Sequence, residues 1–181
     1  IADHAIINMV RYNQIPVEAI EQAKSKLHIA YDHTSHGSQI IGGMDDLNQF
    51  MENNGSQLGL YTYNDGGIDG ALDLKDDFTD VSDLGYYPEW VYATRKYLGW
   101  NCLVEGDYSA GTPAYNSDYN VIIWSWCYLY AAEASINDYL AAMIKLIEDY
   151  PQVNFVFMTA HANGTGESGP VHYWNRYIRQ F

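Results

Sequence analysis

The chain has 181 residues, the length of one ordinary domain, so we expect a single domain over residues 1–181. Hydrophobic residues make up 48% of the chain, and this fraction excludes a disordered protein. Acidic residues outnumber basic ones by 23 to 9, and the resulting net charge of −14 argues against binding to nucleic acid or to an anionic membrane surface. No apolar run reaches the ~18 residues of a membrane span. A neutral glycan or another small molecule is the better-matched partner.

Helices and strands are predicted to alternate along the chain. Helical spacing and helix-ending residues predict helices at 17–26, 40–55, 89–100, 135–150 and 172–181. Apolar runs predict strands at 27–31, 58–63, 121–126 and 153–159. The remainder of 72–119 has the composition of a long, acidic, Gly- and Tyr-rich loop. Continuously apolar strands separated by helices indicate an α/β fold with a parallel sheet that is covered on both faces.

Polar residues follow or interrupt these strands near their carboxyl ends. Asp32 to His36 follow the first strand, Asp65 to Gly70 the second and His161 the fourth, while Ser125 lies in the third. Ligands of open parallel sheets bind at the carboxyl ends of the strands. The sequence therefore places its candidate site at this edge of the sheet.

Ser35 lies in a strand-to-helix turn, where a serine hydroxyl can be exposed next to backbone N–H groups that hold an oxyanion. The alternative is that Ser35 only caps the following helix. A nucleophilic serine needs a base within hydrogen-bonding distance, and His161 at the end of the last strand is the candidate. The alternative for His161 is a hydrogen bond to the backbone of its own loop.

Two further residues are candidates for oxyanion or substrate binding. Gly67 lies in a glycine-rich turn where a backbone N–H can closely approach a substrate carbonyl, although an ordinary tight turn has the same composition. Ser125 is a polar residue within an apolar strand, so its hydroxyl either bonds to the backbone or faces the site. Both interpretations stay open.

The histidines also permit a metal site. Asp32, His33, His36 and His161 offer nitrogen and oxygen ligands, but His33 and His36 lie in a turn, where a spacing of three is not diagnostic. Cys102 and Cys127 are too few for a disulfide scaffold and could form one bridge. Low Lys content, many Tyr and Asn residues and high acidity indicate an exported protein, extracellular or at the cell surface.

Taken together, the segments HIAYDHTSHG (28–37), GGIDGA (66–71) and VIIWSWC (121–127) resemble blocks of the SGNH (GDSL-like) hydrolase superfamily, in an exported bacterial branch. The resemblance implies a flavodoxin-like three-layer sandwich with Ser35 as nucleophile and Gly67 in the oxyanion hole. It places Ser125 where the family carries an Asn donor. His36, next to Ser35, is an expected substrate-binding residue.

The chain departs from the family pattern in two ways. The Asn of the third block is absent, and losing one oxyanion donor typically lowers the rate by about 10²–10³-fold. The family's Asp-x-x-His block follows a last strand near the C-terminus, and no such strand precedes Phe181. Three readings follow: His161 replaces the usual base, the chain is a fragment, or the site is degenerate.

The sequence thus predicts a serine esterase or deacetylase that acts on a carbohydrate ester and needs no metal or other cofactor. Ser35 would attack the acyl carbon, His161 would accept its proton and Asp32 would orient a histidine. One alternative is a non-catalytic, exported binding or assembly module on the same fold. Another is a metal-dependent hydrolase built on His33 and His36.

Overall fold

The computed structural model describes residue 8 and residues 13–80, 83–127, 133–161 and 164–181. Five parallel strands form its central sheet in the order β2-β3-β1-β6-β7. Their bounds are β1 His28–Asp32, β2 Tyr63–Asn64, β3 Leu72–Asp76, β6 Val121–Trp124 and β7 Asn154–Val156. The predicted parallel α/β architecture is confirmed.

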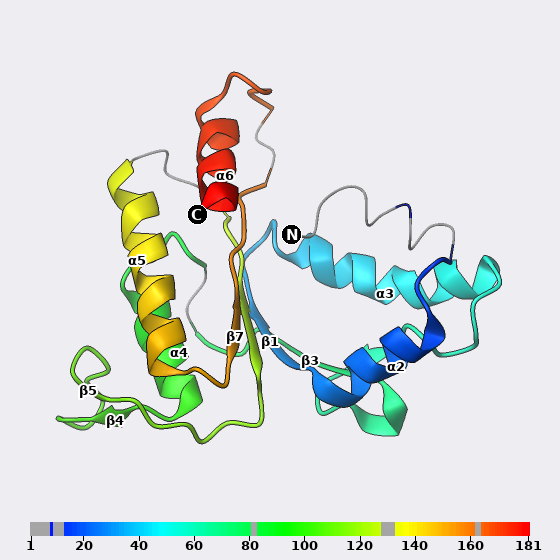
Figure 1. Cartoon of the computed structure of the whole chain (residues 1–181), viewed down its shortest axis with the longest axis horizontal. Coiled ribbons are helices and arrows are strands. Elements are labelled where there is room, and N and C mark those ends of the chain that lie inside the picture. Colours follow the sequence, from blue (N-terminus) through cyan, green and yellow to red (C-terminus); the bar gives the residue numbers. More distant parts are fainter. Residues whose placement is uncertain (1–7, 9–12, 81–82, 128–132, 162–163) are drawn as a thin grey trace.

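Helices cover both faces of this sheet (Figure 1). The helices are α2 Val17–Lys26, α3 Ser38–Asn53, α4 Glu89–Leu98, α5 Glu133–Asp149 and α6 Pro170–Gln180, with a 3₁₀ turn η1 at Ile68–Gly70. Figure 1 shows α2 and α3 on one face, α4 and α5 on the other, and α6 beyond the carboxyl end of β7. The architecture is that of a flavodoxin-like sandwich, and each helix agrees with a predicted segment to within a few residues.

The second strand of the sequence prediction is wrong. Leu58–Tyr61 forms turns, Gly59 has a φ of 71°, and β2 retains only Tyr63 and Asn64 from that region. Between β2 and β1 lies β3, which pairs with both and belongs to the segment predicted as loop. Its polar Asp73 is buried and its Oδ2 lies 2.7 Å from His28 Nδ1, so a strand with acidic residues fits inside the sheet. The amino-acid composition of the segment could not show that His28 is the partner of Asp73.

The two faces of the sheet are packed unequally. On the α4/α5 face, aromatic side chains of four elements form a continuous core that includes Trp90, Trp124, Tyr139, Tyr150 and Phe155. A buried chain of hydrogen bonds crosses it, because Trp124 Nε1 donates to Thr94 Oγ1 (2.9 Å), which donates to the Trp90 carbonyl (2.8 Å). On the opposite face, α3 buries only Met51 and α2 buries none of its residues. The sheet is therefore held mainly from the α4/α5 side.

A small antiparallel pair, β4 (Asn101–Cys102) with β5 (Gly111–Thr112), lies near the amino ends of the central strands (Figure 1). Cys127 lies three residues beyond β6, at the carboxyl edge of the sheet. Both cysteines are free thiols, so the disulfide considered from the sequence does not form. Within the described part of the chain, no helix is both long enough and apolar enough to cross a bilayer.

Candidate functional site

The buried carboxylate of Asp32 holds the turn after β1 in place from the protein interior. This carboxylate accepts hydrogen bonds from the backbone N–H of His33 (3.0 Å) and from the N–H (2.9 Å) and hydroxyl of Thr79. Burial raises the pKa of Asp32 to about 6, although these hydrogen bonds act in the opposite direction. Thr34 Oγ1 donates to Asp83 Oδ2 (2.9 Å). Asp32 therefore holds the turn against the β3–α4 loop, and among the described residues its carboxylate makes no hydrogen bond to an imidazole ring.

Gly37 allows the turn to lie close to its neighbours. A Cβ at this position would be 2.2 Å from His33 Cβ and 2.7 Å from Ser125 Oγ, so any larger residue forces its neighbours to move. Tyr31 Oη donates to the Gly37 carbonyl (3.0 Å) and ties the start of α3 to the first strand. Ser125 is buried against this glycine, so its side chain packs on the turn from the interior of the protein.

The side chain of Cys127 contacts two exposed residues of the same turn. Its Sγ lies 3.5 Å from Ser35 Oγ and 3.4 Å from His36 Nδ1. Both partners are exposed and lie just before α3, near the positive end of its helix dipole. The structure therefore brings a thiol, a hydroxyl and an imidazole together at the carboxyl edge of the sheet.

These surroundings favour the charged form of the thiol. Hydrogen bonds from Ser35, then Thr34 and His36, lower the pKa of Cys127 from 9.0 to about 7. A thiolate is the nucleophilic form of cysteine, and a pKa of this size leaves much of it ionised at neutral pH. Its geometry and its lowered pKa make Cys127 a candidate nucleophile.

The imidazole ring of His161 stacks on that of His36. The two rings stack with centroids 3.9 Å apart and planes inclined by 8°. Asn175 of α6 positions the preceding residue, since its Oδ1 accepts from the Ala160 N–H (2.9 Å) and its Nδ2 donates to the Ala160 carbonyl (2.8 Å). His161 therefore restrains the ring of His36.

The sequence-predicted residues are placed in three groups. Ser35, His36 and His161 come together, while Asp32 and Ser125 lie beneath them as supports of the turn. No hydrogen bond joins Ser35 to His161, both of which the structure describes.

Gly67 lies away from this group, because it precedes β3 at the amino ends of the strands, next to Asp73. Its assignment to the oxyanion hole depended on the incorrect second strand.

Sequence reasoning missed the central member of the site. The sequence suggests Cys127 only as half of a disulfide, although it directly follows the strand predicted at 121–126. Cysteine at a strand's carboxyl end was the available signal, and its neighbours Ser35 and His36 are about 90 residues away in the chain. Asn175 carried no signal, because a helical Asn without a known partner is uninformative.

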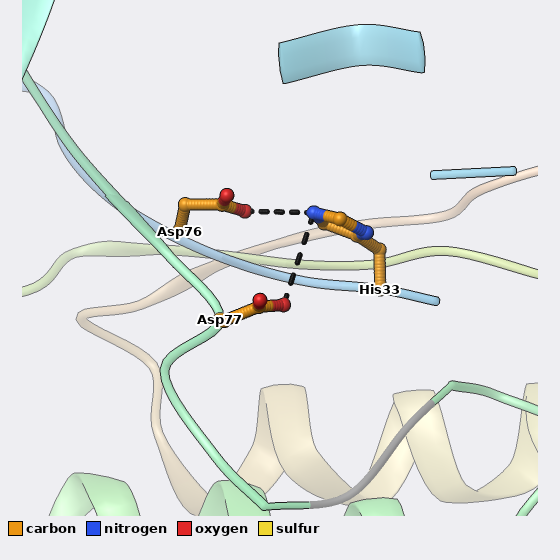
Figure 2. Close-up of side chains that lie close together, drawn as sticks. All are labelled: His33, Asp76 and Asp77. Carbon is orange, nitrogen blue, oxygen red and sulfur yellow. Dashed lines mark hydrogen bonds and ion pairs between the residues drawn. The ribbon is translucent and has the colours of Figure 1, made fainter. Parts of the chain in front are cut away.

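His33 and His36 have different partners, and the structure does not bring them together in the common metal site predicted as an alternative. Its Nε2 lies 2.8 Å from Asp76 Oδ1 and 3.8 Å from Asp77 Oδ1 (Figure 2). His36 instead faces Cys127. The ligand atoms of His33, Asp76 and Asp77 all lie within 4.8 Å of one another, and these three residues could hold a cation.

A cavity of about 540 Å³ opens between α4 and the loop after β3. Aromatic and polar side chains line it, among them Asp77, Phe78, Thr79, Tyr92 and Tyr97. The hydrogen bonds from Thr79 to Asp32 connect this lining to the turn that carries Ser35. The cavity is large enough for a sugar-sized ligand.

Comparisons with protein-family models, with curated proteins and with solved structures find no match to this chain.

Proposed function

We propose that the protein hydrolyses carboxylic esters, with carbohydrate esters as the substrate class, through a covalent acyl-enzyme formed at the carboxyl edge of the sheet. One observation carries the proposal: Cys127 Sγ has Ser35 Oγ and His36 Nδ1 within 3.5 Å, at the amino end of α3. A nucleophile paired with a base and a hydroxyl donor is the arrangement that acyl transfer requires. The lining of the cavity between α4 and the loop after β3, with Tyr92 and Tyr97, suits the apolar faces of sugar rings.

The geometry favours Cys127 as the nucleophile. His36 takes the thiol proton, and the Cys127 sulfur attacks the acyl carbon to give a tetrahedral oxyanion. When this oxyanion collapses, the bond from carbon to the sugar oxygen breaks, and the imidazolium of His36 returns the proton to the leaving alcohol. Water, deprotonated by the same imidazole, then cleaves the thioester and releases the carboxylic acid.

In this scheme the hydroxyl of Ser35 acts as a hydrogen-bond donor. Its hydroxyl stabilises the thiolate in the free protein and becomes available once the carbon–sulfur bond forms. It can then donate to the oxyanion, an interaction that strengthens in the transition state. His161 keeps the His36 ring in place by stacking.

A second assignment makes Ser35 the nucleophile, as the family resemblance implies. The 3.5 Å contact from Ser35 Oγ to Cys127 Sγ favours it, because a thiolate with a pKa of about 7 can accept the hydroxyl proton. The acyl-enzyme would then be an oxygen ester on Ser35. Both assignments use the same residues and differ in which atom carries the acyl group.

Hydrolysis of p-nitrophenyl acetate and of an acetylated sugar tests the proposal. We expect Cys127→Ala to lower kcat/KM by about 10³-fold or more, and Ser35→Ala by about 10²–10³-fold, the usual cost of one oxyanion donor. Cys102→Ser is the matched control and should retain full activity, because Cys102 lies at the opposite end of the sheet. Circular dichroism verifies that each variant is folded.

Mass spectrometry of the trapped acyl-enzyme separates the two assignments. Acetyl on Cys127 supports the thiolate mechanism. Acetyl on Ser35, with labelling of Ser35 by a fluorophosphonate, supports the serine mechanism. If folded wild-type protein turns over neither substrate and Cys127→Ala changes nothing, the hydrolase proposal is overturned and the non-catalytic binding module becomes the better explanation.

A further inference from the structure

The cluster formed by His33, Asp76 and Asp77 lies outside the thiol site and has no part in the proposed ester hydrolysis. Its residues come from the ends of β1 and β3, which are neighbours in the sheet with Tyr31 paired to Asp76. This pairing places the first residue after β1 beside the last residue of β3 and the first after it (Figure 2). The backbone register thus brings one nitrogen and two oxygen ligands together.

The hydrogen bonds of the His33 ring determine which nitrogen can bind a cation. Its Nδ1 lies 3.1 Å from the Thr34 carbonyl, and a carbonyl oxygen only accepts hydrogen bonds. Nδ1 therefore carries a proton, and in a neutral ring the lone pair lies on Nε2. That lone pair faces the carboxylate of Asp76 at 2.8 Å. Two acceptors at this distance repel each other unless a positive charge lies at the ring.

The cluster holds more acidic than basic groups, because one imidazole faces two carboxylates. Among the described residues, His33 is the sole ion-pair partner of Asp76 and of Asp77, since the adjacent Lys75 pairs with Asp65. A divalent cation balances the charges of both carboxylates and converts the Nε2 lone pair into a ligand. A backbone carbonyl bound to the other ring nitrogen is the usual support of a metal-binding histidine.

We propose that His33 Nε2, Asp76 and Asp77 bind a divalent transition-metal cation, Mn²⁺ or Zn²⁺. One imidazole and two carboxylates suit these ions, whereas Ca²⁺ and Mg²⁺ prefer oxygen ligands alone. Three protein ligands leave coordination positions open, and the exposed side chains of Asp76 and Asp77 admit water to them. Asp77 also lines the 540 Å³ cavity, so the cation would lie at the border of that cavity.

Calorimetric titration of the chelator-treated full chain tests this site. The titration is done in the Cys127→Ala background, because Cys127 and His36 are themselves attractive ligands for Zn²⁺. We expect one equivalent of Mn²⁺ or Zn²⁺ to bind, at least tenfold more tightly than Ca²⁺ or Mg²⁺. The double variant Asp76→Asn/Asp77→Asn should weaken binding at least tenfold, and both side chains are exposed enough for the variant to fold.

Asp80→Asn is the matched control, since it removes an exposed acidic charge from the same loop without touching the cluster. It should leave the affinity within twofold of the parent protein. Equal loss in Asp80→Asn, equal affinity for Ca²⁺ and Zn²⁺, or no binding of any of the four ions would overturn the proposal. A nitrogen-15 spectrum supplies an independent readout, because bound Zn²⁺ shifts the Nε2 resonance of His33 while Nδ1 stays protonated. The result is independent of whether the protein hydrolyses esters.

Discussion

Gly37 is the residue on which the geometry of the turn most directly depends. The absent Cβ leaves room for His33 and Ser125, and the chain direction set there places Ser35 and His36 against Cys127. Its φ of −66° is accessible to any residue, so space and not backbone freedom requires glycine at this position.

Gly37→Ala should therefore destabilise the protein by about 1–3 kcal/mol, the usual cost of forcing extra volume into a packed site. Urea unfolding measures this change. Gly42→Ala in the following helix α3 is the matched control, because a Cβ at Gly42 meets nothing within 4 Å. That substitution should stabilise the protein by about 0.5–1 kcal/mol, the helical advantage of Ala over Gly. Equal effects of the two substitutions would contradict the packing argument.

The second prediction at this scale concerns the thiol of Cys127. Thr34, Ser35 and His36 face it, with His161 behind His36, and its pKa is about 7. Because only the thiolate is alkylated, the rate of reaction with iodoacetamide should rise between pH 6 and pH 8 and level off above. An ordinary cysteine thiol ionises near pH 8.5.

Peptide mass spectrometry follows Cys127 and Cys102 in the same sample, so Cys102 serves as the internal reference. The Ser35 hydroxyl contributes most to lowering the pKa of Cys127, so Ser35→Ala should move the midpoint of the Cys127 profile to higher pH. A midpoint near 8.5 in the wild-type protein would show that the turn does not activate the thiol.

At the scale of elements, the layer formed by α2 and α3 is the more weakly held side of the sheet. Helix α5 buries Ile136, Tyr139, Leu140, Met143 and Leu146, whereas α3 buries Met51 alone. Local opening of a helix becomes easier as it buries fewer apolar side chains. The weak layer includes the amino end of α3, against which Cys127 lies.

Amide hydrogen exchange should show this difference. We expect amides in the middle of α3 to exchange at least tenfold faster than those in the middle of α5, with β1 and β6 the most protected elements. Mass spectrometry at pH 7 gives these rates for each peptide. Uniform protection across α3 and α5 would mean that both layers open only with the whole protein.

For the whole molecule, charge is the dominant property. A net charge of −14 destabilises the folded state through self-repulsion, and added salt screens it. Raising NaCl from 10 to 200 mM should increase the melting temperature by about 2–4 °C, which corresponds to about 1 kcal/mol for a chain of this size. Differential scanning calorimetry at constant pH provides the measurement. A melting temperature that falls with added salt would point to attractive ion pairs as the larger effect.

The whole fold was largely predictable from sequence because three strands, β1, β6 and β7, are apolar and lie between recognisable helices. Strand β3 was missed because burial of Asp73 depends on His28, which lies in another strand. The apparent strand at 58–63 has suitable side chains, but its backbone turns at Gly59. Ser35, His36 and His161 follow from their positions at strand ends. Cys127 becomes part of the site only when sheet order places the end of β6 beside the end of β1.

The free, partly exposed thiol at position 127 also has a consequence for oxidative chemistry. Peroxides convert accessible thiolates to sulfenic acid, which is usually rescued by a second cysteine that forms a disulfide. Cys102 lies at the other end of the sheet and cannot serve as that resolving partner without unfolding. An oxidised Cys127 therefore depends on a thiol from outside the chain for reduction through a disulfide, so its recovery follows the reducing capacity of the surroundings.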